Sequence, residues 1–520
     1  MQASVRAVET PGVSTAGPAA TAPQAADASF TTAVGSDPDA PRADSASGLS
    51  RRRVPQRAIE LIGLALGIGV ITSVTLGRSL SNDEFWQLAA GQWMLAHHAV
   101  VGLDPFSYTE SHRRWITDEW GSEVALAALF RAFGAAAYNL YAIVLGSLSL
   151  LASMAYARTL GARGGRIAAI VMLLAIGVAA VVAGDRGLDF SLVFLPLELL
   201  VLARARTNPR WLWALPPLTI AWVNTHGSVL IGLLVLGVEL GWSLVPAMWA
   251  VRVGGTGRSQ HTGALALTLL GCVLATGVTP YGYGLMTYDV GVTTNGQIAQ
   301  YILEWNSPDF HSWLVLAAYA VPLAVLVLCI RNRRVPVLEG TLGALLFIEA
   351  LRTQRLVIYL MVVAVGLAAS LPARPAWSTT ARRWAGAGLV VMGIAILAAP
   401  SVPMGSVSSS LPIGAFDYLS SHPGRIFTEY TWGDYSVARH RATFVDGRTD
   451  LFEGPVLTEF FDIMNLSIDP DPVFRSYGVD YVVWAPATAL SEFLTHDPRW
   501  HVVDRTAVAW VFARTGTPDL

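Results

Sequence analysis

Eleven apolar stretches constrain the fold of this chain most strongly. A helix needs roughly 20 apolar residues to cross a bilayer. The chain is 53% hydrophobic and only 14% charged, whereas soluble domains carry about a quarter charged residues. We therefore predict an α-helical polytopic membrane protein with about 11 transmembrane helices, in which 337–351 and 355–371 fit either two spans or one re-entrant pair. The stretches are 58–78, 136–156, 167–183, 189–204, 211–224, 228–250, 264–280, 313–330, 337–351, 355–371 and 385–400.

Arginine placement predicts the orientation in the membrane. With a cytoplasmic N-terminus, every predicted inside loop carries arginine, as the positive-inside rule requires. The segments 79–135 and 281–312 and the C-terminal region then lie outside. No lysine occurs among the basic residues, which indicates a high-GC bacterial genome. The prediction is a multi-pass protein of the bacterial cell membrane with an extracytoplasmic C-terminal domain, and the net charge of −2 gives no indication of nucleic acid as a partner.

Three domains follow from the changes in composition. Residues 1–55 are poor in large apolar side chains and are expected to form a disordered cytoplasmic tail. Residues 56–400 form the transmembrane domain with its outer loop 79–135. Residues 401–520 are expected to form a small α/β domain, because strand and helix patterns alternate there. The strands are expected at 424–429, 442–446, 480–484, 501–504 and 507–513, and the helices at 455–465 and 470–477.

Carboxylates gather in the predicted outer loops. Asp83 and Glu84 directly follow the first apolar stretch, and Asp118 and Glu119 precede the second. Glu304 lies in the next large outer loop. A carboxylate in a partly dry pocket can act as a general base that activates an acceptor hydroxyl. Adjacent acids are common in loops, so the prediction of an active site rests on their combination with aromatic neighbours and nearby arginines.

Arg186, Arg352 and Arg355 are exceptions to the positive-inside rule, because they fall at outer ends of apolar stretches. An anionic ligand such as a phosphate would explain them, since guanidinium groups donate paired hydrogen bonds to phosphate oxygens. Salt bridges to nearby acids such as Glu349 are the alternative. His226 lies in another outer turn, where it is either a further donor to the ligand or a structural hydrogen-bonding residue.

Several short motifs together resemble the GT-C superfamily of membrane glycosyltransferases. The likeness is strongest to bacterial proteins grouped with polyprenyl-phosphate-sugar-dependent mannosyltransferases and arabinosyltransferases. It covers most of residues 58–485 in short islands. These are Asp83-Glu84-Phe85-Trp86, Asp104-Pro105-Phe106-Ser107-Tyr108, Glu119-Trp120, Asn224-Thr225-His226-Gly227, Thr279-Pro280-Tyr281-Gly282, Glu304-Trp305, Arg352 with Arg355, Glu429-Tyr430, Trp432-Gly433-Asp434-Tyr435 and Phe444-Val445-Asp446-Gly447-Arg448-Thr449-Asp450.

The resemblance implies an inverting transfer from a lipid-phosphate-linked sugar, with an acid of the first outer loop as catalytic base. Asp83 best matches that acid, and Glu84 is second. Related sequences often carry Trp at the position of Phe85 and Gly at the position of Asp434, so the chain departs from the pattern at both. Members differ in their need for a divalent metal, so a metal cofactor stays open.

The first hypothesis is therefore an outer-face glycosyltransferase with a polyprenyl-phosphate sugar and membrane lipid as partners. The acceptor is a glycan, lipid or protein of the envelope. The rival hypothesis is a non-catalytic transporter or an assembly factor for envelope polysaccharide. A transporter should carry ionisable groups near the middle of its spans. Glu198, Glu239 and Glu349 fit that description, but most acids lie in the outer loops, which favours chemistry at the outer surface.

Overall fold

A computed structural model describes most of the chain beyond residue 53. The described residues are 54–80, 83–182, 186–245, 255–256, 261–294, 296, 303–372, 401, 403 and 406–516. Residues Val54–Leu520 belong to one compact unit. The expected N-terminal tail and the eleventh apolar stretch, 385–400, lie outside the described residues.

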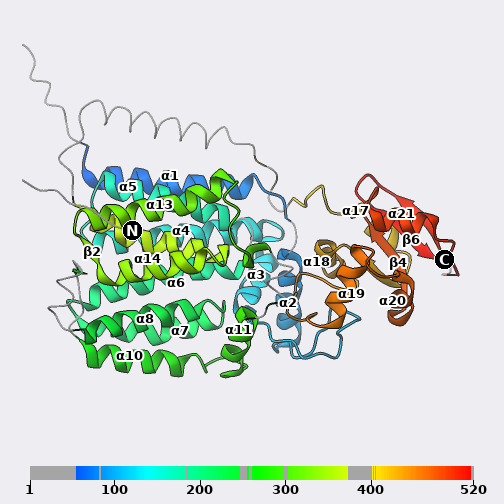
Figure 1. The fold of residues 1–520 in the computed structure, drawn as a ribbon, viewed down its shortest axis with the longest axis horizontal. Helices are drawn as coiled ribbons and strands as arrows, with labels where there is room; N and C mark the ends of the chain where they lie inside the picture. Colours follow the sequence, from blue (N-terminus) through cyan, green and yellow to red (C-terminus); the bar gives the residue numbers. More distant parts are fainter. Residues whose placement is uncertain are drawn as a thin grey trace, which may run out of the picture. The chain divides into compact units, whose positions relative to one another are not determined.

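Helices occupy the other ten predicted apolar stretches (Figure 1). Their sequences are apolar on nearly all sides, as expected for helices that face other helices or lipid. Among the described residues, α1 and α4 are long and apolar enough to cross a membrane, judged by length and composition alone. These bundle helices are α1 (Gln56–Leu76), α4 (Ala136–Thr159), α5 (Gly165–Val182), α6 (Arg186–Ala205), the 3-10 helix η1 (Pro209–Ala214) with α7 (Leu215–Val223), α8 (Val229–Leu244), α10 (Thr262–Ala275), α13 (Trp313–Arg331), α14 (Val337–Ala350), and the 3-10 helix η3 (Gln354–Leu356) with α15 (Val357–Ser370).

The segment 79–135, which is predicted to be the first outer loop, is more ordered than a plain loop. It contains α2 (Glu84–His97) and α3 (Trp120–Phe133), which pack against each other. The second outer segment contains α11 (Gly284–Thr294) and the 3-10 helix η2 (Leu303–Trp305). A short parallel pair, β1 (Gly255–Thr256) with β2 (Val335–Pro336), joins two further loops.

The C-terminal region contains one four-stranded sheet in the order β3-β4-β6-β5. Strand β3 runs parallel to β4, and the other two pairs are antiparallel. Its elements are α17 (Ile413–Leu419), β3 (Arg425–Thr428), α18 (Tyr430–Ala438), α19 (Pro455–Met464), α20 (Pro470–Tyr477), β4 (Val479–Trp484), α21 (Ala489–His496), β5 (Trp500–Arg505) and β6 (Trp510–Arg514).

The strand predicted at 442–446 is wrong. Only an isolated bridge occurs there, between Thr443 and Ser107 of the first outer loop. Thr443 donates its backbone N–H to Phe106 and accepts one from Tyr108 at the backbone carbonyl, so its hydrogen bonds go to that loop and not to the sheet. Beyond Thr443 the chain turns, because Asp446 bends back to bind Arg448.

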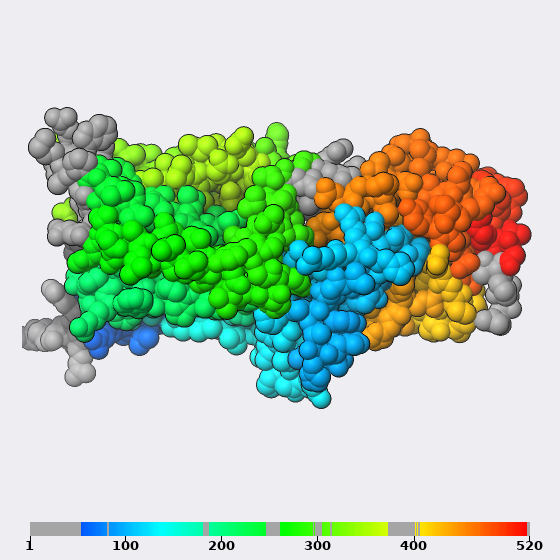
Figure 2. Space-filling view, turned by 90° about the horizontal axis from the view of Figure 1, so that it is seen from below, coloured from blue at the N-terminus to red at the C-terminus, as the bar shows by residue number. Residues whose placement is uncertain are grey.

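The first outer loop and the C-terminal region share hydrophobic cores. One cluster packs Met94 and Trp115 with Phe427 and Phe444, and another packs Phe85 with Tyr435 and residues of the sheet. Figure 2 shows atoms of the first outer loop directly beside those of the C-terminal region. Burial of large apolar and aromatic side chains is the main stabilising term in such packing. This shared core holds the acids of the outer loop against the C-terminal region.

Candidate active site

At the start of helix α2, the two adjacent acids Asp83 and Glu84 have different surroundings. Glu84 is only 1% exposed and forms an ion pair with Arg78. Asp83 is half-buried at the helix N-cap position, where the helix dipole favours a negative charge. Its Oδ1 accepts a hydrogen bond of 3.2 Å from the indole N–H of Trp86. The carboxylate of Glu84 is therefore engaged in a buried ion pair, and Asp83 is the better candidate for the base.

Asp83 faces the C-terminal region at Gly447. A Cβ at position 447 would stand 2.6 Å from Oδ1 of Asp83 and 2.9 Å from Oδ1 of Asp434. Only glycine fits there, and the two carboxyl groups approach the same point from opposite elements. Asp434 is 1% exposed, and burial, followed by the charges of Asp83 and Asp446, raises its pKa well above the ordinary value.

Glu119 links α2 to the turn at residues 224–228. Gln87, one helical turn after Asp83, donates a hydrogen bond of 3.0 Å to Oε2 of Glu119. Oε1 of Glu119 lies 3.4 Å from Nε2 of His226. The two turns are held together because Gly121 N–H donates to the carbonyl of Asn224 at 2.8 Å.

His226 connects Glu119 to Arg355. Ser228 N–H donates to Nδ1 of His226 at 3.0 Å, so in the neutral ring the proton is on Nε2. That Nε2–H points to Glu119, and Nη2 of Arg355 lies 3.3 Å from Nε2 as a close neighbour, because two donors cannot share a hydrogen bond. The Arg355 guanidinium lies 5.7 Å from the centre of the Trp305 ring and 4.0 Å from Oε2 of Glu304. The positive charge of Arg355 thus lies at one end of a series of contacts that begins at Gln87, one helical turn after Asp83.

The other two exceptional arginines differ from Arg355. Helix α14 ends at Ala350 and η3 begins at Gln354, so Arg352 and Arg355 do not share a helical face, contrary to their three-residue spacing. Arg352 is exposed and lies 3.6 Å from Glu349, which is the salt bridge considered as an alternative above. Arg186 begins α6, and its side chain lies outside the described part of the structure.

Asp118 belongs to a further group of acids. Its neighbours are Asp289 of α11 and Glu123 of α3. Burial, followed by the charge of Asp118, raises the pKa of Asp289 to about 8 and that of Glu123 well above its ordinary value. Cγ of Asp289 is 2.9 Å from where a Cβ at Gly227 would stand. This acid group therefore adjoins the turn that carries His226.

The structure adds site residues that sequence reasoning missed. Asp289 lies in the predicted outer segment 281–312, but a lone acid in an apolar helix gave no signal. Asp434 was visible only as a departure from the family pattern, and Gln87 had no signal. The described residues contain no group of three or more His, Cys, Asp or Glu side chains arranged to hold an ion. A metal cofactor therefore stays an open question.

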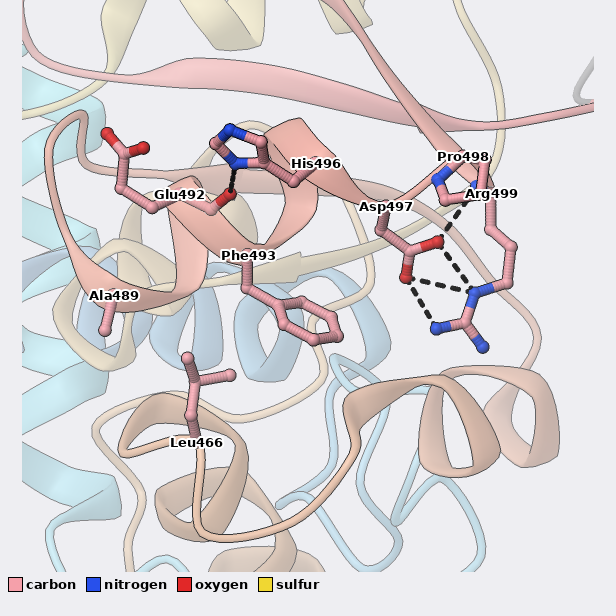
Figure 3. Close-up of a pocket in the computed structure, with 8 residues that line it drawn as sticks. All are labelled: Leu466, Ala489, Glu492, Phe493, His496, Asp497, Pro498 and Arg499. Carbon is pink, nitrogen blue, oxygen red and sulfur yellow. Dashed lines mark hydrogen bonds and ion pairs between the residues drawn. The ribbon is translucent and has the colours of Figure 1, made fainter.

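A surface groove in the C-terminal region lies apart from these residues (Figure 3). None of the predicted site residues lines it. Its polar groups bind their own neighbours, since Arg499 is paired with Asp497 and His496 contacts the carbonyl of Glu492 at 2.8 Å. The candidate active site is therefore the network between α2, the His226 turn and Arg355.

Solved structures of other proteins have a similar fold. The Archaeoglobus fulgidus oligosaccharyltransferase in its apo form matches with a TM-score of 0.54 at 12% identity, over 83% of this chain and 70% of that chain. ArnT from Cupriavidus metallidurans bound to undecaprenyl phosphate matches with a TM-score of 0.52 at 14% identity, over 89% of this chain and 99% of that chain. The apo state of ArnT matches with a TM-score of 0.53 at 15% identity, over 88% and 98%.

The fold is that of the GT-C glycosyltransferases, to which both of these proteins belong. The resemblance inferred from the short motifs is thereby confirmed at the level of the fold. No family model matches the sequence, and a search of curated proteins found no match.

Proposed function

We propose that this chain is a membrane glycosyltransferase that moves a sugar from a polyprenyl-phosphate donor to an envelope glycan, lipid or protein on the outer face. One observation carries the proposal. Gln87, one turn after the half-buried Asp83 on α2, donates to Glu119, Glu119 lies beside His226, and the cation Arg355 lies 3.3 Å from His226, so a series of neighbouring residues leads from the helix of Asp83 to Arg355. A base and a phosphate-binding group are the two functions that such a transfer requires.

The transfer is a single displacement at the anomeric carbon of the donor sugar. The acceptor hydroxyl oxygen forms the new bond to that carbon while the bond from the carbon to the phosphate oxygen breaks. The hydroxyl proton passes to the carboxylate of Asp83, and polyprenyl phosphate leaves with the bonding electron pair and one more negative charge. Attack opposite the leaving group inverts the anomeric centre. Arg355 stabilises the charge that develops on the phosphate.

The lipid part of the donor is supported by a structural neighbour. ArnT, which shares the fold, is bound to undecaprenyl phosphate in one of its structures. The apolar helices of the bundle offer a lipid-facing surface on which a polyprenyl chain can lie. In this proposal Glu304 orients Arg355, His226 offers a further donor to the phosphate beside it, and the group of Asp118 and Asp289 lies beside the sugar. Arg186 and Arg352 stay secondary candidates for the phosphate. A divalent metal stays an open cofactor, and no step is assigned to one.

The experiment that tests the function is a transfer assay with the purified full-length protein. Undecaprenyl-phosphate-linked mannose and arabinose serve as donors, and bacterial membranes serve as the source of acceptors. We expect release of undecaprenyl phosphate together with a labelled product. If neither donor is consumed, while a known GT-C enzyme consumes its donor in the same assay, these two donors are excluded and further lipid-linked sugars must be tried.

Arg355→Lys is expected to weaken binding of undecaprenyl phosphate about tenfold or more. A lysine keeps the charge but loses the forked donor geometry, and hydrogen bonds to charged groups are worth about 1.5 to 3 kcal/mol. Arg352→Lys is the matched control and should change the Kd less than about twofold, because Arg352 is exposed beside Glu349. Equal affinities for the wild type and both variants, measured by tryptophan fluorescence or calorimetry, would contradict the role of Arg355.

The proposed orientation has its own test. A reporter that is active only outside the cytoplasm should be active when fused after Leu520 and silent after Arg334. The reverse pattern would place the outer loops in the cytoplasm and remove the argument for a donor on the outer face. The two fusion sites differ in position but carry the same reporter, so each serves as the other's control.

A further inference from the structure

A second carboxyl group faces the proposed base from the C-terminal region. Asp434 lies in α18, which packs on α2, and the rings of Phe85 and Tyr435 meet edge to face at 5.5 Å. Two glycines make room around Asp434, one in α18 and one in the segment that α18 packs on. A Cβ at Gly433 would overlap the carbonyl of Val445, and one at Gly447 would crowd both Asp83 and Asp434. The absence of a side chain at Gly447 therefore leaves room for the two carboxyl groups at one point.

The surroundings of Asp434 favour a proton on this residue. The carboxyl oxygens of Asp83 and Asp434 lie 2.6 Å and 2.9 Å from the same point at Gly447, and two neighbouring carboxylates cannot both ionise easily, so one of them keeps a proton near neutral pH. Asp434 is 1% exposed, whereas Asp83 is half-buried, and burial disfavours the charged form. Burial and the neighbouring charge of Asp83 raise the pKa of Asp434 well above its ordinary value, which agrees with this assignment.

The hydrogen bonds of Asp434 leave one oxygen for that proton. Gly447 N–H donates to Oδ1 of Asp434 at 2.6 Å, so Oδ2 is the oxygen left to carry it. The other ionisable groups near Asp434 are Asp446, Arg448 and Tyr430. Arg448 is paired with Asp446 at 2.6 Å, and the hydroxyl of Tyr430 is hydrogen-bonded to Thr449. Asp83 is therefore the acid that Asp434 most directly affects.

We propose that Asp434 is a positioning residue that keeps its proton and donates a hydrogen bond to the ionised carboxylate of Asp83. The inference rests on the proposed function, because it assigns Asp434 to the base of that same reaction. The bond orients the Asp83 carboxylate toward the acceptor hydroxyl and lowers its proton affinity, so that Asp83 is ionised when the acceptor binds. The C-terminal region thus completes the base that the first outer loop supplies.

The first test does not depend on activity. Infrared difference spectra of the full-length protein at neutral pH should show the carbonyl band of a protonated carboxyl group. Other buried acids such as Asp289 and Glu123 also contribute to this band, so Asp434→Asn should remove one component of it, while Asp417→Asn, at an exposed acid of the same region, should leave it unchanged. Identical spectra for the wild type and Asp434→Asn would show that Asp434 is ionised and would overturn the inference, whether or not the protein transfers sugar.

The second test is the pH profile of kcat/KM for transfer. Asparagine still accepts from Gly447 and donates to Asp83, so Asp434→Asn should keep the acid limb near its wild-type position. Asp434→Ala removes the donor, so the limb should move up by about one pH unit, since a hydrogen bond to the charged form lowers the pKa of an acid. At neutral pH kcat should fall about tenfold with KM within about twofold.

The outcomes separate this inference from the proposed function. If Asp83→Asn abolishes transfer but the profiles of both Asp434 variants overlay that of the wild type, the function stands and the inference fails. If the wild type transfers no sugar from any lipid-linked donor, the function fails. In that case the infrared component assigned to Asp434 would still show that this residue is protonated, but the role of its proton in transfer would be overturned.

Discussion

Asp83→Asn is expected to lower the rate of sugar transfer by about 10² to 10⁴, the usual range for loss of a general base. Asparagine has the same shape and can still accept the bond from the Trp86 indole, but it cannot take the proton of an acceptor hydroxyl. The N-cap position makes no hydrogen bond from the side chain to the helix backbone, so folding should be preserved. Release of undecaprenyl phosphate from the lipid-linked donor is the measurement.

Two controls sharpen this result. Asp417→Asn changes a carboxylate of equal charge in an exposed pair with Arg439 and should leave transfer unchanged. Binding of undecaprenyl phosphate to Asp83→Asn should stay near the wild-type value, because the phosphate site is assigned to Arg355. Near wild-type turnover of Asp83→Asn would reject Asp83 as the base. Asp118 would then be the next candidate, because Glu84 is held in its ion pair with Arg78.

Arg448→Met is expected to destabilise the protein by about 3 to 5 kcal/mol, the usual cost of leaving a buried charge without its partner. Arg448 is 1% exposed and pairs with Asp104 at 2.5 Å and with Asp446 at 2.6 Å. Its guanidinium lies 4.6 Å from the centre of the Trp115 ring. Burial alone would lower the pKa of Arg448, but these two carboxylates raise it above its ordinary value, so the group stays charged.

Thermal unfolding of the purified protein, followed by circular dichroism and by proteolysis of the C-terminal region, measures this effect. Arg439→Met is the matched control, and its exposed pair with Asp417 should contribute only about 0 to 1 kcal/mol. Adding Asp104→Asn and Asp446→Asn to Arg448→Met removes the unpaired charges and should recover much of the loss. Equal midpoints for Arg448→Met and Arg439→Met would contradict a stabilising role of this pair.

Local patterns in the sequence predicted the regular elements well. The ten apolar stretches among the described residues coincide with helices, because a long apolar run has few other stable conformations. Strands such as β4 were also predicted from their apolar residues, which are nearly all buried. The failure at 442–446 has a physical cause. Thr443 makes its backbone hydrogen bonds with Phe106 and Tyr108, and no neighbouring residue reveals a partner so distant along the chain.

The sequence by itself therefore determined the helical bundle, the acids beside the first apolar helix and the resemblance to the GT-C glycosyltransferases. It could not determine which of these side chains meet. Arg448 and Asp104 are 344 positions apart, and the carboxyl groups of Asp434 and Asp83 share the space beside Gly447, where a side chain would crowd both. The three-residue spacing of Arg352 and Arg355 would place them on one face of a continuous helix, but α14 ends at Ala350 and η3 begins only at Gln354. Only the tertiary structure decided these contacts, because burial and charge pairing act between residues that are close in space, whatever their separation along the chain.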